Sequence, residues 1–135
     1  MTNANAALNS AQSRKMMSGA GLRTFFNIAD LWKLTGKECM TLLGVTNEST
    51  YYKWKKNPDC CTLARDTLER LSYILGIYKA LQILLPREDA ADDWIKKPNN
   101  APLFNGRSAL DRMLSGNVVD LFIVRQYLDA QRGGI

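Results

Sequence analysis

The side chains that carry out most enzyme chemistry are scarce in this sequence of 135 residues. There is no histidine, which excludes Ser-His and Cys-His nucleophile pairs, histidine general bases and histidine metal ligands. The three cysteines, Cys39, Cys60 and Cys61, cannot all pair in disulfides, and the adjacent two lack metal-ligand spacing. We therefore expect reduced, partly buried thiols in a reducing cytoplasm, with no metal, no cofactor and no enzymatic activity.

Basic side chains are concentrated in the first half of the chain. The sequence has 18 basic and 13 acidic residues, a net charge of +5. Residues 1–65 contain nine basic and four acidic side chains, whereas residues 66–135 contain nine of each. This asymmetry favours an anionic partner for the first half. Nucleic acid is our first interpretation, and an ordinary solvated basic face is the alternative.

Residues 35–56 have the pattern of a helix, a tight glycine turn and a second helix. Thr35 and Glu38 fit a capping box at the start of the first helix, and Gly44 fits its end. A helix-turn-helix needs an apolar wedge between its two helices. The residues expected to form this wedge are Leu42, Leu43, Val45, Tyr51 and Trp54.

The second helix of this pattern, from about Asn47 to Lys56, would serve as a recognition helix. Short polar side chains at its start can reach base edges, and lysines near its end can pair with phosphates. The candidate DNA-binding residues are Asn47, Ser49, Thr50, Tyr52, Lys53, Lys55 and Lys56. A purely structural helical hairpin is the alternative, and Glu48 disfavours close approach to phosphates.

Helical periodicity continues along the chain without strand alternation, so we predict an all-α fold of about seven helices. Residues 1–20 are predicted to be a flexible arm and residues 21–60 the helix-turn-helix region. Residues 61–85 form a spine helix, with Thr62 as its cap and two apolar stripes that pack on two sides. Residues 86–135 form a small C-terminal domain with a flexible tail. No signal peptide or membrane span is expected.

The spine helix and the C-terminal domain contain further positions that affect helix packing and capping. Gly76, inside the spine helix, either allows close helix packing or marks a bend. Ser108 and Asp111 fit a second capping box, and Asn117 is expected to cap the last helix. That helix, Val118 to about Gln131, is apolar over more of its circumference than one core face needs. The excess suggests a second surface, for a dimer partner or another protein, unless most of it is intramolecular core.

Two stretches of the second half resemble the toxin-binding domain of the MbcA/ParS/Xre antitoxins. They are PLFNGRSALDRMLSG and VVDLFIVRQYLDAQRGG, preceded by Trp94 and a Pro-Asn-Asn loop. The stretch LLGVTNESTYYKW resembles the Xre-type helix-turn-helix of the same family, so the resemblance extends from about Phe25 onward. Ala109 stands where the family pattern usually has proline after serine. Alanine is also a good helix former, so the expected fold is unchanged.

The resemblance implies a type II antitoxin that represses its own operon and neutralises a cognate RES-domain toxin by covering its NAD pocket. Such a toxin either degrades NAD or transfers ADP-ribose. The implied partners are the toxin, operator DNA and a second copy of the chain, with no membrane. The candidate toxin-binding residues are Arg107, Arg112, Phe122, Ile123, Tyr127, Gln131, Arg132, Gly133, Gly134 and Ile135. The alternatives are a stand-alone dimeric helix-turn-helix regulator, and an interaction module that does not bind DNA.

Overall fold

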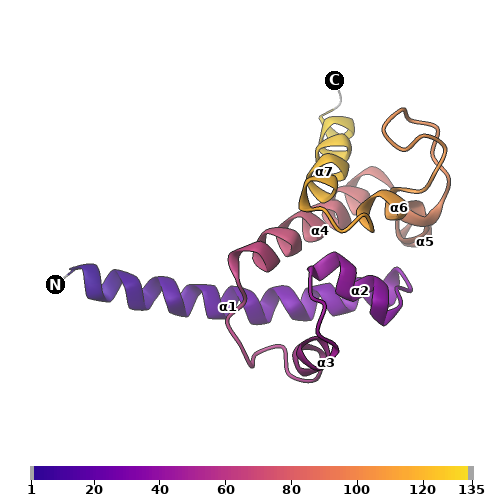
Figure 1. The fold of residues 1–135 in the computed structure, drawn as a ribbon. Helices are drawn as coiled ribbons and strands as arrows, with labels where there is room; N and C mark the ends of the chain where they lie inside the picture. Colours follow the sequence, from indigo (N-terminus) through magenta and orange to yellow (C-terminus); the bar gives the residue numbers. More distant parts are fainter. Residues whose placement is uncertain (1, 134–135) are drawn as a thin grey trace.

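The structure, a computed structural model, describes residues 2–133, and every regular element in this range is helical. This confirms the predicted all-α fold (Figure 1). The elements are α1 (Thr2–Leu31), α2 (Gly36–Leu43), α3 (Glu48–Lys56), α4 (Arg65–Leu84), α5 (Glu88–Asp93), the 3-10 helix η1 (Trp94–Lys96), α6 (Ala109–Met113) and α7 (Val118–Arg132). None of the helices in the described range is long and apolar enough to cross a membrane.

The N-terminal segment differs from the flexible arm expected over residues 1–20, because α1 already begins at Thr2. Asparagine and serine cost less than about 0.7 kcal/mol each in a helix interior, and no proline interrupts the segment. A tertiary contact also anchors it. The buried Ser18 hydroxyl donates to the Arg14 carbonyl and accepts the backbone N–H of Leu63 at 2.9 Å.

The N-terminal half is a helix-turn-helix packed on the C-terminal part of α1. The predicted wedge is confirmed: Leu42, Leu43, Tyr51 and Trp54 are buried, and Val45 is half-buried. The Thr35–Glu38 capping box is present, with both reciprocal hydrogen bonds. Gly44 ends α2 in the left-handed conformation at φ 72°, which glycine adopts without steric cost.

Helix α4 is the predicted spine, with α1 on one side and α7 on the other (Figure 1). It begins at Arg65, and Thr62 does not cap it. The Ser18–Leu63 hydrogen bond holds the chain that precedes α4 against α1. The buried side chains that α4 and α7 contribute to the core are Leu71, Ile74, Ile77, Ala80 and Leu81 of α4, and Leu121, Val124 and Leu128 of α7.

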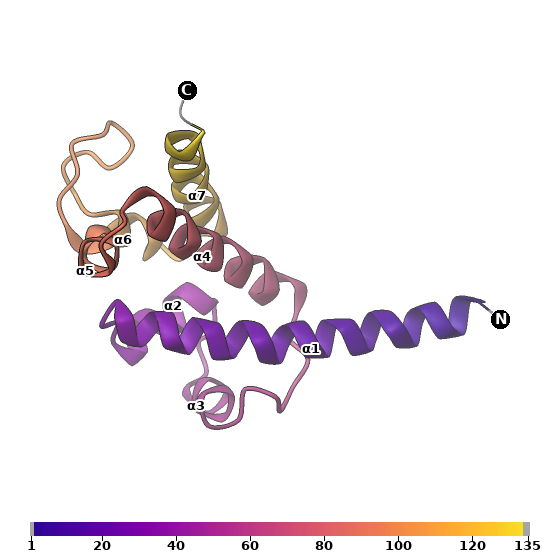
Figure 2. The ribbon, with the colours of Figure 1, turned by 180° about the vertical axis from the view of Figure 1, so that it is seen from behind.

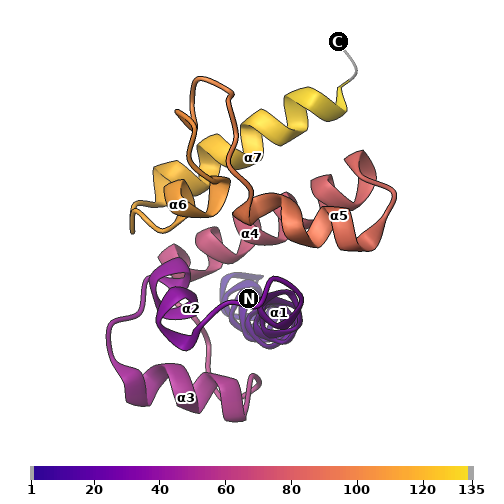
Figure 3. The same ribbon diagram turned by 90° about the vertical axis from the view of Figure 1, so that its right-hand side faces the viewer.

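The C-terminal half contains an ordered loop that stands beside α7 (Figure 3). Pro98 and Ser108 form an isolated antiparallel bridge, and the Asn99 N–H donates to the Arg107 carbonyl at 3.0 Å. The predicted Ser108–Asp111 capping box is present at the start of α6. Asn117 precedes α7, but its side chain makes no capping hydrogen bond.

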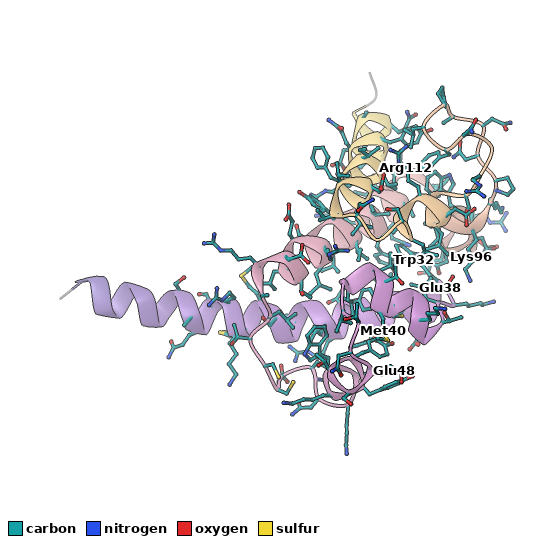
Figure 4. The ribbon with its side chains drawn as sticks, in the orientation of Figure 1. Trp32, Glu38, Met40, Glu48, Lys96 and Arg112 are labelled. Carbon is teal, nitrogen blue, oxygen red and sulfur yellow. The ribbon has the colours of Figure 1, made fainter. Side chains whose placement is uncertain are left out.

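Polar contacts also join the halves. The Arg70 guanidinium, on α4, donates to the Gly116 carbonyl at 3.1 Å. The Lys96 ammonium, on η1, donates to the Lys33 carbonyl at 2.9 Å, next to the buried Trp32 (Figure 4). The rear view shows α4 lying between the α1–α3 group and the α5–α7 group (Figure 2).

Candidate DNA and toxin interfaces

The outer face of α3 lies opposite the buried pair Tyr51 and Trp54. At 100° per residue, the positions farthest from this pair are Ser49, Tyr52, Lys53 and Lys56, and all four are exposed. This face carries two lysines and no carboxylate. It has the composition that a helix needs to contact both base edges and phosphates in a major groove.

The other three predicted DNA-binding residues lie at the edges of this face. Asn47 is the N-cap, and its Oδ1 accepts the Thr50 N–H at 3.1 Å, which holds its side chain at the start of α3. Thr50 is half-buried. Lys55, although exposed, occupies the flank beside Glu48, about 70° from the centre of the buried side. The structure therefore divides the predicted set into a central face and a rim.

Packing beneath α3 is tight and apolar. Tyr51 contacts the Phe26 and Tyr52 rings at centroid distances of 5.9 and 5.0 Å. Burial raises the pKa of the Tyr51 hydroxyl well above its ordinary value, and burial also raises the pKa of the neighbouring Cys39 thiol. Both groups are neutral at physiological pH. They support the recognition helix mechanically and contribute no charge to it.

The remaining cysteines lie in the connection between α3 and α4. Cys60 and Cys61 are half-buried, with their sulfur atoms 2.6 Å apart. Burial raises the pKa of the Cys60 thiol, which favours the unreactive protonated form. Over the described residues, no group of three or more His, Cys, Asp or Glu side chains could hold a metal ion.

Helix α7 presents apolar side chains on two separate flanks. Phe122 is 42% exposed and packs edge-on against Tyr73 of α4 at 5.7 Å. Tyr127 lies on the opposite flank, where its ring packs against Phe104 of the loop at 5.3 Å. Ile123 is half-buried between these flanks, beside the exposed Val119. At 100° per residue, Val119 and Ile123 therefore lie between Phe122 and Tyr127 on the solvent side of α7, in one arc of about 140°.

The Tyr127 flank borders a hollow of about 230 Å³ at the junction of α4, η1 and α7. Trp94 packs on Phe104 at 5.9 Å and continues the aromatic row that includes Tyr127. Sequence reasoning did not name Phe104 as a site residue, although it lies within the motif that carries the family resemblance. The residues lining the hollow are Leu81, Leu84, Leu85, Trp94, Tyr127, Leu128 and Gln131.

Arg112, a predicted toxin-binding residue, is largely committed to the fold. Its Nε lies 2.9 Å from a carboxylate oxygen of Asp120, and its Nη1 donates to the Leu103 carbonyl at 2.6 Å. The Ser115 hydroxyl and Arg112 together lower the pKa of Asp120, so this ion pair persists at neutral pH. Arg107, by contrast, is exposed at the base of the loop.

The end of α7 lies at the pole of the molecule opposite α3 (Figures 1 and 3). Gln131, Arg132 and Gly133 are exposed there, and Arg132 lies 3.8 Å from Asp129. Gly134 and Ile135, also predicted to bind toxin, lie outside the described residues. Because α3 and the end of α7 are at opposite poles, one molecule can contact two large partners at once.

The fold and its two surfaces define a helix-turn-helix protein with a separate protein-binding domain. Residues 11–76 match the family model described as the antitoxin Xre-like helix-turn-helix domain, and residues 80–134 match the antitoxin Xre/MbcA/ParS C-terminal toxin-binding domain. The chain is also 56% identical over 115 residues to the uncharacterized protein y4oB of Sinorhizobium fredii, across 85% of this chain and 86% of the relative. The chain belongs to the Xre/MbcA/ParS antitoxin family.

This membership establishes the antitoxin class, with toxin and DNA as the two kinds of partner. Neither matched family is enzymatic. The helix-turn-helix match begins at residue 11, so it includes a segment that we expected to be a flexible arm. It also extends to residue 76, well into α4, so the spine helix belongs partly to the DNA-binding domain.

Proposed function

We propose that this antitoxin, acting as a homodimer, neutralises a RES-domain toxin by covering its NAD pocket and represses its own operon through α3. The observation that carries the proposal is that the two surfaces lie at opposite ends of the molecule. The basic face of α3 and the exposed end of α7 lie at opposite poles, so DNA need not displace the toxin.

The Tyr127 flank is the better candidate for toxin contact. It adjoins the hollow of about 230 Å³, and it leads directly into Gln131 and Arg132 at the end of the helix. A toxin pocket that accepts NAD phosphates carries basic or polar donors. The exposed amide of Gln131 suits such donors, while the aromatic row supplies buried area.

Co-expression with a RES-type toxin encoded next to this chain tests neutralisation. Wild-type antitoxin should restore growth and co-purify with the toxin. Tyr127→Lys should weaken both results at least tenfold, because a charge would enter the apolar contact. Phe122→Lys places the same charge on the other side of the predicted toxin-binding set, and an equal loss in both variants would show that the contact extends across α7. If the wild-type protein neither rescues growth nor co-purifies, the toxin assignment is wrong and the stand-alone regulator is favoured.

Removal of Arg132–Ile135 separates tail insertion from contact through the helical surface. If the tail enters the toxin pocket, the truncated antitoxin should still co-purify but should lose neutralisation. Unchanged neutralisation would show that the Tyr127 flank suffices by itself. Helicity measured by circular dichroism should stay unchanged, because the removed residues begin in the last turn of α7.

Fluorescence anisotropy with DNA from upstream of the operon tests repression. The free antitoxin and the antitoxin–toxin complex should both bind this DNA more tightly than a scrambled duplex of equal length. Equal affinity for the two duplexes would contradict sequence-specific repression and favour the interaction module.

A further inference from the structure

The N-terminal part of α1 projects beyond the rest of the molecule (Figures 1 and 2). All residues from Ser10 to Met17 are exposed, and the first buried side chain of the described part of the helix is Ser18. An isolated helix of this length is only marginally stable in water, since its stability depends on packing of one face. The projection is therefore a helix without its packing partner.

A hollow of about 280 Å³ opens between α1 and α4 at the root of this projection. Apolar side chains dominate its walls, and Met17 at its edge is 60% exposed. The residues lining the hollow are Met17, Ala20, Gly21 and Thr24 of α1, and Leu68, Leu71, Ser72 and Leu75 of α4.

The hollow and the projection share one face of α1. Met17, Ala20 and Thr24 follow the three-to-four-residue repeat of a helix stripe. Continued toward the N-terminus, the same repeat reaches Ser13 and Ser10, both exposed and both small. Small side chains allow two helix backbones to approach closely. The chain therefore contains both a hollow and a slender helix of suitable shape to fill it.

These two features are self-complementary under a two-fold rotation. If two copies lie with their α1 helices antiparallel, each projection enters the hollow of the other copy, and the contact closes. A projection of 16 residues is about 24 Å long at 1.5 Å per residue. Two such contacts bury an area on the order of 1,000 Å², the lower bound for a specific interface.

We propose that the α1–α4 hollow is the homodimer interface, occupied by the projecting α1 of a second copy of this chain. This inference rests on the homodimer named in the proposed function and specifies its surface. It is independent of the toxin. It also assigns a role to the exposed Ser10–Met17 segment of α1.

Adjacent methionines provide a matched pair of variants. Met17 lines the hollow, whereas Met16 is 75% exposed and faces a separate depression formed with Gln12, Lys15 and Asp59. Size-exclusion chromatography with light scattering on the full chain, without toxin or DNA, should give twice the 15.2 kDa chain mass for wild type and Met16→Glu. Met17→Glu should give the monomer mass, with at least a tenfold weaker dimer by sedimentation.

A second variant tests the same interface without placing a charge in the hollow, so the result does not depend on whether Met17→Glu folds. Deletion of residues 2–13 removes only part of the projection. This variant should also be a folded monomer, with an unchanged melting temperature. A dimeric Met17→Glu, or a dimeric deletion variant, would overturn the interface while leaving the homodimer intact. A monomeric wild type at tens of micromolar would overturn the homodimer itself. Loss of toxin binding by Met17→Glu with the dimer retained would assign the hollow to the toxin.

Discussion

The guanidinium of Arg70 lies directly over Gly44, where the helix-turn-helix makes its tight turn. A Cβ atom on Gly44 would lie 2.6 Å from the Arg70 Nε. The Arg70 side chain is only 11% exposed and is held by Asp66 at 2.9 Å and by the Gly116 carbonyl at 3.1 Å. This arginine thus connects the turn before α3, the spine helix and the short turn between α6 and α7.

Gly44→Ala should destabilise the fold for two reasons. The φ of 72° costs a residue with a Cβ about 1–2 kcal/mol, and displacement of Arg70 adds roughly 1 kcal/mol from its lost hydrogen bonds. Gly106→Ala is the control, because Gly106 has φ 81° but no atom within 4 Å of its Cβ position. Urea unfolding should show a larger loss for Gly44→Ala. Equal losses would mean that the contact with Arg70 contributes nothing.

Gly76→Ala should have little effect alone and should be stabilising in the absence of Arg125. The added Cβ would lie 2.5 Å from the Arg125 Nε, which would break the Arg125 hydrogen bond to the Ser72 carbonyl. In a helix interior, alanine is more favourable than glycine by about 1 kcal/mol. In an Arg125→Ala background, Gly76→Ala should therefore raise stability by about 1 kcal/mol. A double-mutant cycle by urea unfolding checks this, and simple additivity would contradict it.

Lys53→Ala and Lys56→Ala should weaken DNA binding and reduce its salt dependence. Each lost phosphate contact should lower the slope of log K against log salt by about 0.9. Lys55→Ala should have a smaller effect, because Lys55 lies on the flank of α3 beside Glu48. Anisotropy titrations at several salt concentrations measure the slope. The same change for all three variants would show that the whole helix end, and not its central face, contacts the phosphates.

Asp120→Asn should cost stability near neutral pH and less in acid. The Ser115 hydroxyl and Arg112 lower the folded-state pKa of Asp120. The contribution of this carboxylate to the free energy of unfolding is therefore present above the ordinary pKa of 3.8, and it is lost as pH falls through the folded-state pKa. Loss of hydrogen bonds to this charged group costs roughly 2 kcal/mol at pH 7. The free energies of wild type and variant from urea unfolding should converge only as pH falls below the lowered folded-state pKa of Asp120, which lies under 3.8.

Asp89→Asn serves as the control for this pH dependence. Arg87 also lowers the pKa of Asp89, but that carboxylate is exposed and solvent screens the pair. Its substitution should leave the unfolding curves nearly unchanged at each pH. A difference between wild type and Asp120→Asn that does not shrink as the pH is lowered progressively below 3.8 would exclude the charge as the cause.

The sequence alone determined the local architecture, because caps and turns act over a few residues. The Thr35–Glu38 and Ser108–Asp111 boxes and the left-handed Gly44 are all present as predicted. Apolar periodicity likewise identified the wedge of the helix-turn-helix and the two-sided spine. The sequence motifs of the second half identified the antitoxin family, which both matched domains confirm.

Only the tertiary structure decided which faces remain open, because burial depends on contacts between residues far apart in sequence. The Ser18–Leu63 hydrogen bond, between residues 45 apart in sequence, ties α1 to the chain that precedes α4. The packing of α7 on α4 places Phe122 and Tyr127 on opposite flanks, although both read as apolar in the sequence. The same packing commits Arg112 to Asp120 and leaves the α1–α4 hollow open. No local pattern encodes these contacts, since each requires two elements to meet.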